Sequence, residues 1–397
     1  MSNDTRPEIR FPGFTNDWEQ RKLIDVANYR NGKAHEKDIS KDGDYIVVNS
    51  KFVSTNGTVK KFSDSLIEPL IKGEIAFVLS DVPNGKAIAR TFLVDKNEKY
   101  SLNQRIAGIT PTDETDSYYL YILMNRHPYF LKFDNGVGQT NLSKKEVENF
   151  ETFYPSFEEQ QKIGTFFKQI DDTIALHQRK LDLLKETKKG FLQKMFPKNG
   201  AKVPEIRFPG FTEDWEQRKL GDIFKKDIQK NKDLEFNSDS VISVAKMKLS
   251  TPSAKSSDEY MKTYNKIWKG NIAFEGHTND EFPNGRFVLN DCQDGIVSHI
   301  YDVYSAVDEY DNEFMKRYIN NPYVMRKILI NATSSARMMK SLNSVEFLKQ
   351  SILLPILSEQ QKIGGFFYQL DNIIALHQRK LDLLKETKKG FLQKMFV

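Results

Sequence analysis

Two segments of this chain occur twice with almost the same sequence. Residues 7–23 (PEIRFPGFTNDWEQRKL) differ from residues 204–220 at one position only, where Glu213 replaces Asn16. Residues 158–196 match residues 358–396 at 33 of 39 positions, and from residue 174 onward the match is complete. A repeat of this kind predicts an architecture built from two similar halves.

The sequence between the repeated segments differs in the two halves. Residues 24–154 and 221–354 share only short landmarks, such as KGEIAF at residues 72–77 and KGNIAF at residues 269–274. Common landmarks in otherwise different sequences favour one fold that carries two different surfaces. We therefore interpret the chain as a duplicated frame with two unlike globular inserts.

Each long repeated segment has the heptad pattern of a coiled-coil helix, with apolar residues at alternating spacings of three and four. The predicted seam consists of Ile163, Phe167, Ile170, Ile174, Leu181 and Leu184 in the first copy, and of Ile363, Phe367, Leu370, Ile374, Leu381 and Leu384 in the second. Each helix would be about 58 Å long. Because a narrow apolar seam needs a partner, we expect the two helices to pair as an antiparallel coiled coil with pseudo-twofold symmetry. Ser156 with Glu159, and Ser358 with Gln361, have the spacing of a capping box at each helix start.

Polar residues interrupt this seam at His177, His377, Lys188 and Lys388. In one interpretation they fix the register of the helix pair, since a polar core residue disfavours slipped pairings. In the other, the seam ends near Lys188 and these side chains reach into solvent. A catalytic histidine is the least favoured interpretation.

The inserts have the mixed pattern of an α+β fold. Strands are predicted at residues 45–48, 75–79, 87–94 and 105–110 in the first insert, and at 241–244, 272–274, 286–289 and 296–304 in the second. Helices are predicted at residues 117–125 and 312–320. Polar loops are predicted at residues 80–86, 135–141, 277–286 and 333–340.

The overall composition restricts the class of protein. The single cysteine, Cys292, excludes a disulfide framework and a cysteine-rich zinc site. The first residues lack an apolar secretory signal, and no apolar run reaches the roughly 18 residues of a membrane span, so we expect a cytoplasmic protein. Of the net charge of +5, residues 155–196 and 355–397 carry +2 and +3. The inserts are close to neutral, so any nucleic-acid contact must use local patches.

No catalytic motif is convincing in this sequence. The phosphate-binding P-loop pattern is absent, and the glycine-rich stretch from Gly136 to Asn141 lacks a third glycine and a preceding βαβ strand. Asn320-Asn321-Pro322-Tyr323 has only one proline of the Asn-Pro-Pro-Tyr signature of adenine methyltransferases, and a helix stop is the simpler interpretation. Histidines without ligand spacing do not predict a metal site. We therefore expect no catalytic centre and no cofactor in this chain.

Two motifs carry a resemblance to a known family. PSFEEQQKI at residues 155–163 and PILSEQQKI at residues 355–363 each precede a long helix. They resemble the conserved regions of the specificity subunits of type I restriction–modification enzymes, and the order of inserts and helices spans nearly the whole chain in the same way. GQTNLS at residues 138–143 also resembles that family, whereas the second insert has SARMMKS at residues 335–341.

The resemblance implies a non-catalytic subunit that reads double-stranded DNA. Residues 1–154 and 221–354 would be the two target-recognition domains, each for one half of a bipartite asymmetric sequence. Residues 155–196 and 355–397 would be the conserved helices that set the spacer, with residues 197–220 as linker and repeated segment. The resemblance further implies two methyltransferase subunits with S-adenosylmethionine and two restriction subunits that use ATP and Mg. A self-contained methyltransferase or nuclease, and a coiled-coil scaffold, are the alternatives.

Candidate DNA-binding residues come from the polar loops, because Arg, Lys, Asn, Gln and His suit hydrogen bonds to bases and phosphates. They are Asn84, Lys86, Gln139 and Asn141 in the first insert and His277, Asn279, Arg286 and Arg337 in the second. None of them is inferred from the family, since its base-reading residues vary with the target.

Overall fold

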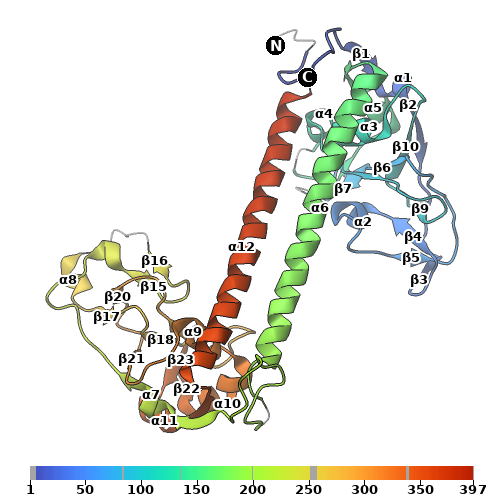
Figure 1. Ribbon diagram of the computed structural model, residues 1–397. Coiled ribbons are helices and arrows are strands. Elements are labelled where there is room, and N and C mark those ends of the chain that lie inside the picture. Colours follow the sequence, from blue (N-terminus) through green and yellow to red (C-terminus); the bar gives the residue numbers. More distant parts are fainter. Residues whose placement is uncertain are drawn as a thin grey trace. The chain divides into compact units, whose positions relative to one another are not determined.

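The computed structural model describes residues 6–82, 85–134, 136–198, 200–250, 257–336 and 339–396. The chain forms two compact units, one of residues 1–178 and 380–397 and the other of residues 179–379 (Figure 1). Helix α6 (Phe157–Lys194) and helix α12 (Leu357–Lys394) each contribute to both units. Each unit therefore contains one insert, the first part of the helix that follows it, and the end of the other helix.

The first unit is built around two four-stranded sheets. One has the strand order β2 (Ala27–Asn31), β10 (Ile106–Pro111), β6 (Ile75–Val78) and β8 (Thr91–Leu93), all antiparallel. The other has the order β3 (Ile39–Ser40), β5 (Phe62–Ser63), β4 (Tyr45–Val48) and β9 (Tyr100–Leu102), in which β4 and β9 are parallel. Two short pairs complete the unit, β1 (Glu19–Lys22) with β12 (Glu151–Tyr154) and β7 (Ser80–Asp81) with β11 (Thr140–Asn141).

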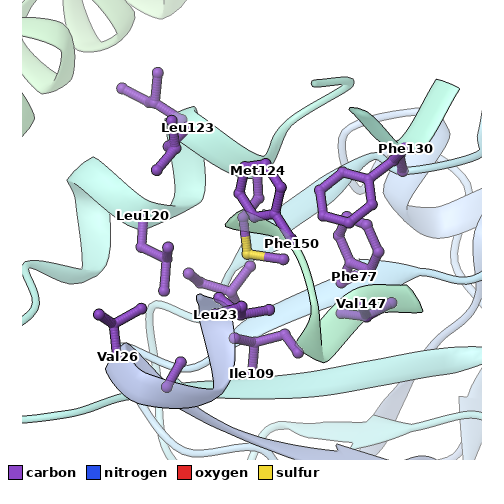
Figure 2. Close-up of a cluster of buried hydrophobic side chains, with 14 of the residues drawn as sticks. Leu23, Val26, Phe77, Ile109, Leu120, Leu123, Met124, Phe130, Val147 and Phe150 are labelled. Atoms are coloured by element: carbon purple, nitrogen blue, oxygen red, sulfur yellow. The ribbon is translucent and has the colours of Figure 1, made fainter. Parts of the chain in front are cut away.

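Short helices cover the first of these sheets. They are α1 (Leu23–Val26), α3 (Ser117–Met124), α4 (Pro128–Leu131) and α5 (Lys144–Glu148), while α2 (Ser50–Ser54) follows strand β4. Figure 2 shows the core between them, where Leu120 and Met124 of α3 lie with Phe77 and Ile109 of the sheet. Apolar residues of the second sheet form a separate cluster with Phe52 of α2.

The second unit repeats the main sheet of the first. Its strand order is β14 (Phe224–Lys226), β21 (Val303–Ala306), β18 (Ile272–Glu275) and β19 (Arg286–Leu289). The strand pairs are β13 (Glu216–Lys219) with β24 (Ser351–Leu354), β15 (Ile242–Ser243) with β16 (Lys248–Leu249), β17 (Asn265–Ile267) with β20 (Gly295–Val297), and β22 (Thr333–Ala336) with β23 (Met339–Leu342). The helices are α7 (Leu220–Ile223), the 3₁₀ turn η1 (Ser238–Ser240), α8 (Asp258–Met261), α9 (Asn312–Tyr318), α10 (Pro322–Ala332) and α11 (Ser344–Lys349). The prediction of an α+β chain with two long helices is confirmed.

Some predicted elements are wrong in extent. The strand predicted at residues 296–304 is two strands, β20 and β21, which belong to different sheets because a turn at Ser298–Tyr301 separates them. Of the strand predicted at residues 87–94, only β8 forms, since the chain turns at Ala89, which has a φ of 56°. The loop predicted at residues 333–340 is most of the β22–β23 hairpin.

The predicted capping boxes also need correction. The side chain of Ser156 accepts a hydrogen bond from the backbone nitrogen of Glu159 at 3.4 Å, but the carboxylate of Glu159 is bound to an arginine instead of closing the box. In the second copy the box is absent, because α12 already begins at Leu357, before Ser358.

Candidate nucleic-acid interface

The repeated N-terminal segment is bound to the start of the long helix by a buried ion pair. The Nε and Nη2 atoms of Arg10 donate to the two carboxylate oxygens of Glu159, both at 2.7 Å. Arg207 and Glu359 form the same pair at the same distances. Two parallel charge-assisted hydrogen bonds offset the desolvation of a carboxylate that is almost fully buried. The hydrogen bond to Glu159 raises the pKa of Arg10 above its ordinary value, although burial acts against this.

The glutamine of the EQQKI motif binds the helix to its insert. The side chain of Gln160 accepts from the backbone nitrogen of Asp116 at 3.1 Å and donates to the carbonyl of Pro155 at 3.0 Å. Gly164 follows one turn later, and a Cβ atom there would lie 2.4 Å from Oδ1 of Asp116. Gln360 and Gly364 make the equivalent approaches to Asp311 and Pro355. We conclude that this motif latches the helix to the first turn of α3 or α9.

Within each unit, the two long helices run antiparallel. In the first unit, Lys388 binds both carboxylate oxygens of Asp171, at 2.6 and 2.7 Å, and the ring centroids of Phe166 and Phe391 are 4.9 Å apart. In the second unit, Lys188 binds Asp371 at 2.6 Å. The two lysines at seam positions thus form ion pairs with carboxylates of the other helix. This favours the interpretation that they fix the register of the helix pair.

The predicted seam residues differ in burial. The fully buried ones are Ile163, Phe167, Leu181, Ile363, Phe367, Leu370 and Leu381. The half-buried ones are Ile170, Ile174, Leu184, Ile374 and Leu384.

In the first unit, two of the predicted polar loops lie side by side. Strand β7 pairs with β11, so that Asn141 lies opposite Ser80 in the register. The exposed Gln139 donates from Nε2 to the hydroxyl of Ser80 at 2.7 Å. Lys86 is exposed at the end of the same loop, whereas Asn84 lies outside the described residues. Gln139, Asn141 and Lys86 therefore come from two chain segments that together form one polar surface.

One carboxylate holds the described residues on both sides of positions 83–84. The side chain of Asp81 accepts hydrogen bonds from the backbone nitrogens of Val82, Ala87 and Ile88, at 2.9, 2.5 and 3.1 Å. A Cβ atom on Gly85 would lie 2.1 Å from this carboxylate, so the turn needs glycine at this position. A fixed turn presents polar side chains at a lower entropic cost of binding than a flexible loop.

The second unit brings its predicted residues together less completely. His277 and Asn279 are exposed, but the side-chain oxygen of Asn279 already accepts from the backbone nitrogens of Glu281 and Phe282. Arg286 donates to the buried carboxylate of Glu275 at 2.9 Å and to the carbonyl of Ala245. Arg337 lies outside the described residues.

Each insert nevertheless pairs the segment after the third strand of its main sheet with an equivalent later segment of the same insert. Leu142, just after β11, donates its backbone nitrogen to the carbonyl of Leu79 at 2.8 Å. Lys340 in β23 donates in the same way to Gly276, just after β18, at 2.7 Å. GQTNLS and the segment around SARMMKS thus occupy corresponding places at the end of the third strand of the main sheet.

Several exposed basic residues near these loops were not predicted. Lys51, Lys61 and Arg105 line one pocket with Gln104 in the first unit. Lys51 and Arg105 have no basic neighbour in the sequence and Lys61 has only Lys60, so no local pattern indicated that the three line one pocket.

Comparison with known proteins identifies the family. Residues 15–186 and 212–386 each match the family described as the type I restriction modification DNA specificity domain. The chain belongs to this family. The two matches coincide with the two halves of the duplication, so the chain carries two DNA-specificity domains in tandem.

Relatives of similar length support this assignment. The type I restriction enzyme MjaVIII specificity subunit of Methanocaldococcus jannaschii is 23% identical, over 95% of this chain and 91% of that subunit. The crystal structure of the S subunit of a type I restriction–modification system from M. genitalium has a TM-score of 0.65 at 15% identity and covers 99% of both chains. A chain from a structural study of complex assembly and conformational transition of the type I system has a TM-score of 0.52 at 14% identity, over 96% of this chain and 98% of that one.

These matches decide between the interpretations of the sequence. They support a specificity subunit, which supplies DNA recognition and not catalysis, over a self-contained enzyme or a scaffold. None of the helices in the described ranges is both long and apolar enough to cross a membrane. Across those same ranges, three or more His, Cys, Asp or Glu side chains do not gather anywhere in a way that could hold a metal ion.

Proposed function

We propose that the chain reads a bipartite, asymmetric DNA target, one half with residues 24–154 and the other with residues 221–354. The observation that carries this proposal is the contrast between a frame that is nearly identical in both halves and inserts that are not. Both inserts are latched to the frame through the same hydrogen bonds of Gln160 and Gln360. Unlike surfaces held in like positions suit two different half-sites.

The frame also suggests how partner subunits bind. Each unit has one exposed leucine on α6 and one on α12, at corresponding heptad positions: Leu176 and Leu383 in the first unit, and Leu376 and Leu183 in the second. All four are more than half exposed, and the same two heptad positions are exposed in both units. We propose that the two similar surfaces around these leucines bind two copies of one methyltransferase subunit, which binds S-adenosylmethionine. Two restriction subunits, which use ATP and Mg, would complete the enzyme.

A domain exchange tests the reading of half-sites. Residues 24–154 are replaced by the corresponding insert of another specificity subunit, and adenine methylation is mapped across the genome of cells that carry the system. We expect only one half of the methylated motif to change, and exchange of residues 221–354 should change only the other. A change in both halves, or in neither, would contradict the assignment of the inserts.

A deletion in the frame tests the spacer. Removing residues 175–181 and 375–381 takes one heptad from each helix and keeps the seam in phase. It shortens each helix by about 10 Å at 1.5 Å per residue, or about three base pairs at 3.4 Å each. We expect both half-sites to be kept and the gap between them to shorten, whereas an unchanged gap would refute the proposed role of the helices.

A further inference from the structure

A shallow pocket on the first unit is lined by basic and amide side chains. Its basic residues are Lys51 after strand β4, Lys61 at the start of β5, and Arg105 in the turn between β9 and β10. Its other lining residues are Glu36, Asn49, Ser50, Asn103 and Gln104. Three segments that are distant in the sequence thus each contribute a basic residue to the lining of one pocket.

The three cations of this pocket outnumber its single carboxylate, that of Glu36, so the lining has a net positive charge. In the part of the chain that the structure describes, Lys51, Lys61 and Arg105 form no ion pair with an acidic side chain. The one acidic lining residue, Glu36, accepts a hydrogen bond from Nε2 of Gln104. A net positive charge beside amide groups provides what a phosphate group requires, namely charge and several hydrogen-bond donors.

The turn that carries Arg105 is held in an uncommon conformation. Arg105 has a φ of 68°, in the left-handed region that costs free energy for a residue with a side chain. The surrounding backbone enforces it, since Lys33 donates to Leu102 at 3.0 Å and accepts from Gln104 at 2.8 Å. Arg105 itself accepts from Leu79 at 3.0 Å. The structure therefore fixes the backbone from which this exposed arginine side chain extends.

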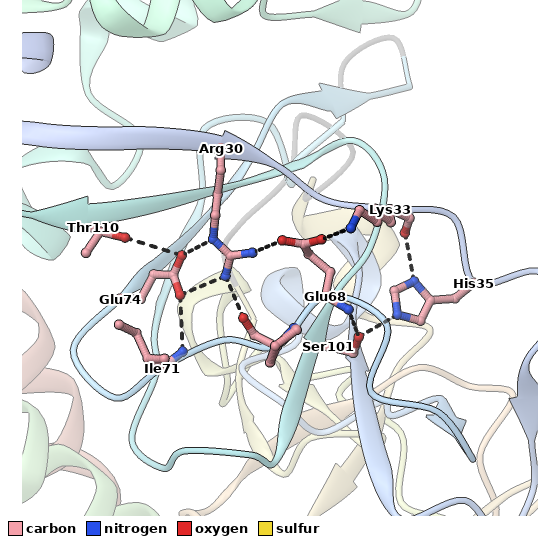
Figure 3. A network of polar contacts seen from close by, with 9 residues as sticks. Arg30, Lys33, His35, Glu68, Ile71, Glu74, Ser101 and Thr110 are labelled. Carbon is pink, nitrogen blue, oxygen red and sulfur yellow. Dashed lines mark hydrogen bonds and ion pairs between the residues drawn. The ribbon is translucent and has the colours of Figure 1, made fainter.

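Figure 3 shows a polar network that includes Lys33, whose backbone holds this turn. Arg30 on β2 binds the carboxylate of the buried Glu74 and also binds Glu68, which in turn binds Lys33 at 2.7 Å. Two acidic and two basic side chains balance one another in this network. The carboxylates of Glu68 and Glu74 are therefore already paired with Arg30 and Lys33 and do not offset the positive charge of the pocket.

A buried histidine connects this network to strand β9. The Nδ1 atom of His35 lies 2.7 Å from the carbonyl of Lys33, so it must carry the proton of that hydrogen bond. Its Nε2 atom lies 2.6 Å from the hydroxyl of Ser101, which donates to it and accepts from the backbone nitrogen of Glu68 at 3.0 Å. These bonds tie the segment that follows β2 to the strand that leads into the Arg105 turn.

The pocket adjoins the polar loops of the candidate interface. The hydroxyl of Ser50 donates to the carbonyl of Ser80, the residue that also binds Gln139. Leu79, which holds Arg105, directly precedes the same loop. The basic pocket and Gln139 are therefore both joined to Ser80 by hydrogen bonds, which places them on neighbouring parts of the same insert.

We propose that this pocket binds a backbone phosphate of the DNA that flanks the half-site read by the first insert. Lys51, Lys61 and Arg105 provide affinity and align the duplex, whereas base discrimination comes from the neighbouring loops. The proposal rests on the proposed function, because it takes double-stranded DNA as the ligand of this insert. It assigns the pocket to sequence-independent binding, which phosphate oxygens provide and base edges do not.

The test measures how DNA affinity of the full chain depends on salt. Binding of labelled duplexes that contain the methylated motif, or a scrambled motif, is followed by fluorescence anisotropy between about 50 and 200 mM salt. For the triple variant Lys51→Ala, Lys61→Ala, Arg105→Ala, the slope of log affinity against log salt should decrease by about 0.9 for each phosphate that the variant no longer neutralises. If all three cations act, the decrease in affinity over this range should be about 40-fold smaller than in the wild type. The affinity ratio of the two duplexes should stay the same.

Matched variants separate this effect from a folding defect. Lys96→Ala and Lys99→Ala remove exposed lysines from another turn of the same insert and should leave the slope unchanged. Arg105→Lys keeps the charge and should restore most of the slope that Arg105→Ala removes. If the triple variant has the wild-type slope, or has a reduced affinity ratio and keeps the slope, the phosphate assignment is wrong and the proposed function stands. If the wild type binds neither duplex, both fail.

Discussion

Removal of one side of a buried ion pair should loosen one unit and leave the other intact. In the variant Arg10→Met, the carboxylate of Glu159 would lose two hydrogen bonds of 2.7 Å while its side chain stays only 1% exposed. Breaking such a pair from one side costs about 3–5 kcal/mol, because a charge is left buried without a partner. The free energy of opening of the segment that contains the start of α6 should decrease by this amount.

Hydrogen exchange measured by mass spectrometry on the full chain can localise this change. Since 1.36 kcal/mol corresponds to a factor of ten, exchange of amides in residues 157–167 should become faster by roughly two to four orders of magnitude. Residues 357–367 of the second unit should exchange as in the wild type. The variant Arg207→Met should give the opposite pattern, because Arg207 and Glu359 form the same pair there.

Two further variants decide whether buried charge is the cause. Arg6→Met breaks an exposed pair with Asp17, whose side chains are 56% and 61% exposed, and should cost about 0–1 kcal/mol. The double variant Arg10→Met, Glu159→Leu removes both charges and should recover most of the stability, since apolar replacement of a buried pair is often neutral. The reasoning is refuted if Arg10→Met has no larger effect than Arg6→Met, or if the double variant is as unstable as the single one.

Three other predictions concern the helices and the recognition loops. Gly364→Ala should destabilise the second unit by about 1–3 kcal/mol in thermal unfolding, because a Cβ atom would lie 2.2 Å from Oδ1 of Asp311. At Gly365 a Cβ atom would meet no atom within 4 Å, so Gly365→Ala should stabilise its helix by about 0.5–1 kcal/mol. Burial raises the pKa of Asp371, but hydrogen bonds from its lysine and arginine partners outweigh this and lower the pKa below the ordinary 3.8. The ionised carboxylate therefore adds to the free energy of unfolding above about pH 4, and this contribution is lost as the pH falls through the lowered pKa. Asp371→Asn should remove this acid-dependent contribution when the free energy of unfolding is measured at each pH. Gln139→Ala should relax discrimination at one base pair by about 1–3 kcal/mol in competition binding and leave the other half-site unchanged.

The sequence predicted best those elements whose pattern is strong and local. The long helices follow from their heptads, and strands β4 and β19 have the predicted bounds because each contains a short run of apolar residues, which in β19 follows Arg286. The boundary between β20 and β21 was missed because the turn at residues 298–302 contains neither glycine nor proline. Without such a turn signal, the apolar residues on both sides predict one continuous strand.

Features that depend on tertiary structure could not be predicted from local pattern. The polar residues of the β22–β23 hairpin suggested a loop, but the hydrogen bond between Lys340 and Gly276 places this segment beside the main sheet. The pairing of β7 with β11 joins residues about sixty positions apart, and nothing in either segment specifies the other. For the same reason the sequence identified Gln139 as a candidate but not the basic pocket beside it.

The way in which the frame holds each insert explains how the inserts can differ so widely. The latch of Gln160 contacts the insert at a backbone nitrogen, and Gly164 gives room to the aspartate that caps helix α3. In the second unit, Gln360 makes the same backbone hydrogen bond with the aspartate that caps α9. An insert therefore needs an aspartate-capped helix start and a strand that can pair with the repeated N-terminal segment, as β12 and β24 do. Because main-chain atoms are the same for every sequence, the remaining side chains of an insert are free to change with the DNA half-site while the frame stays constant.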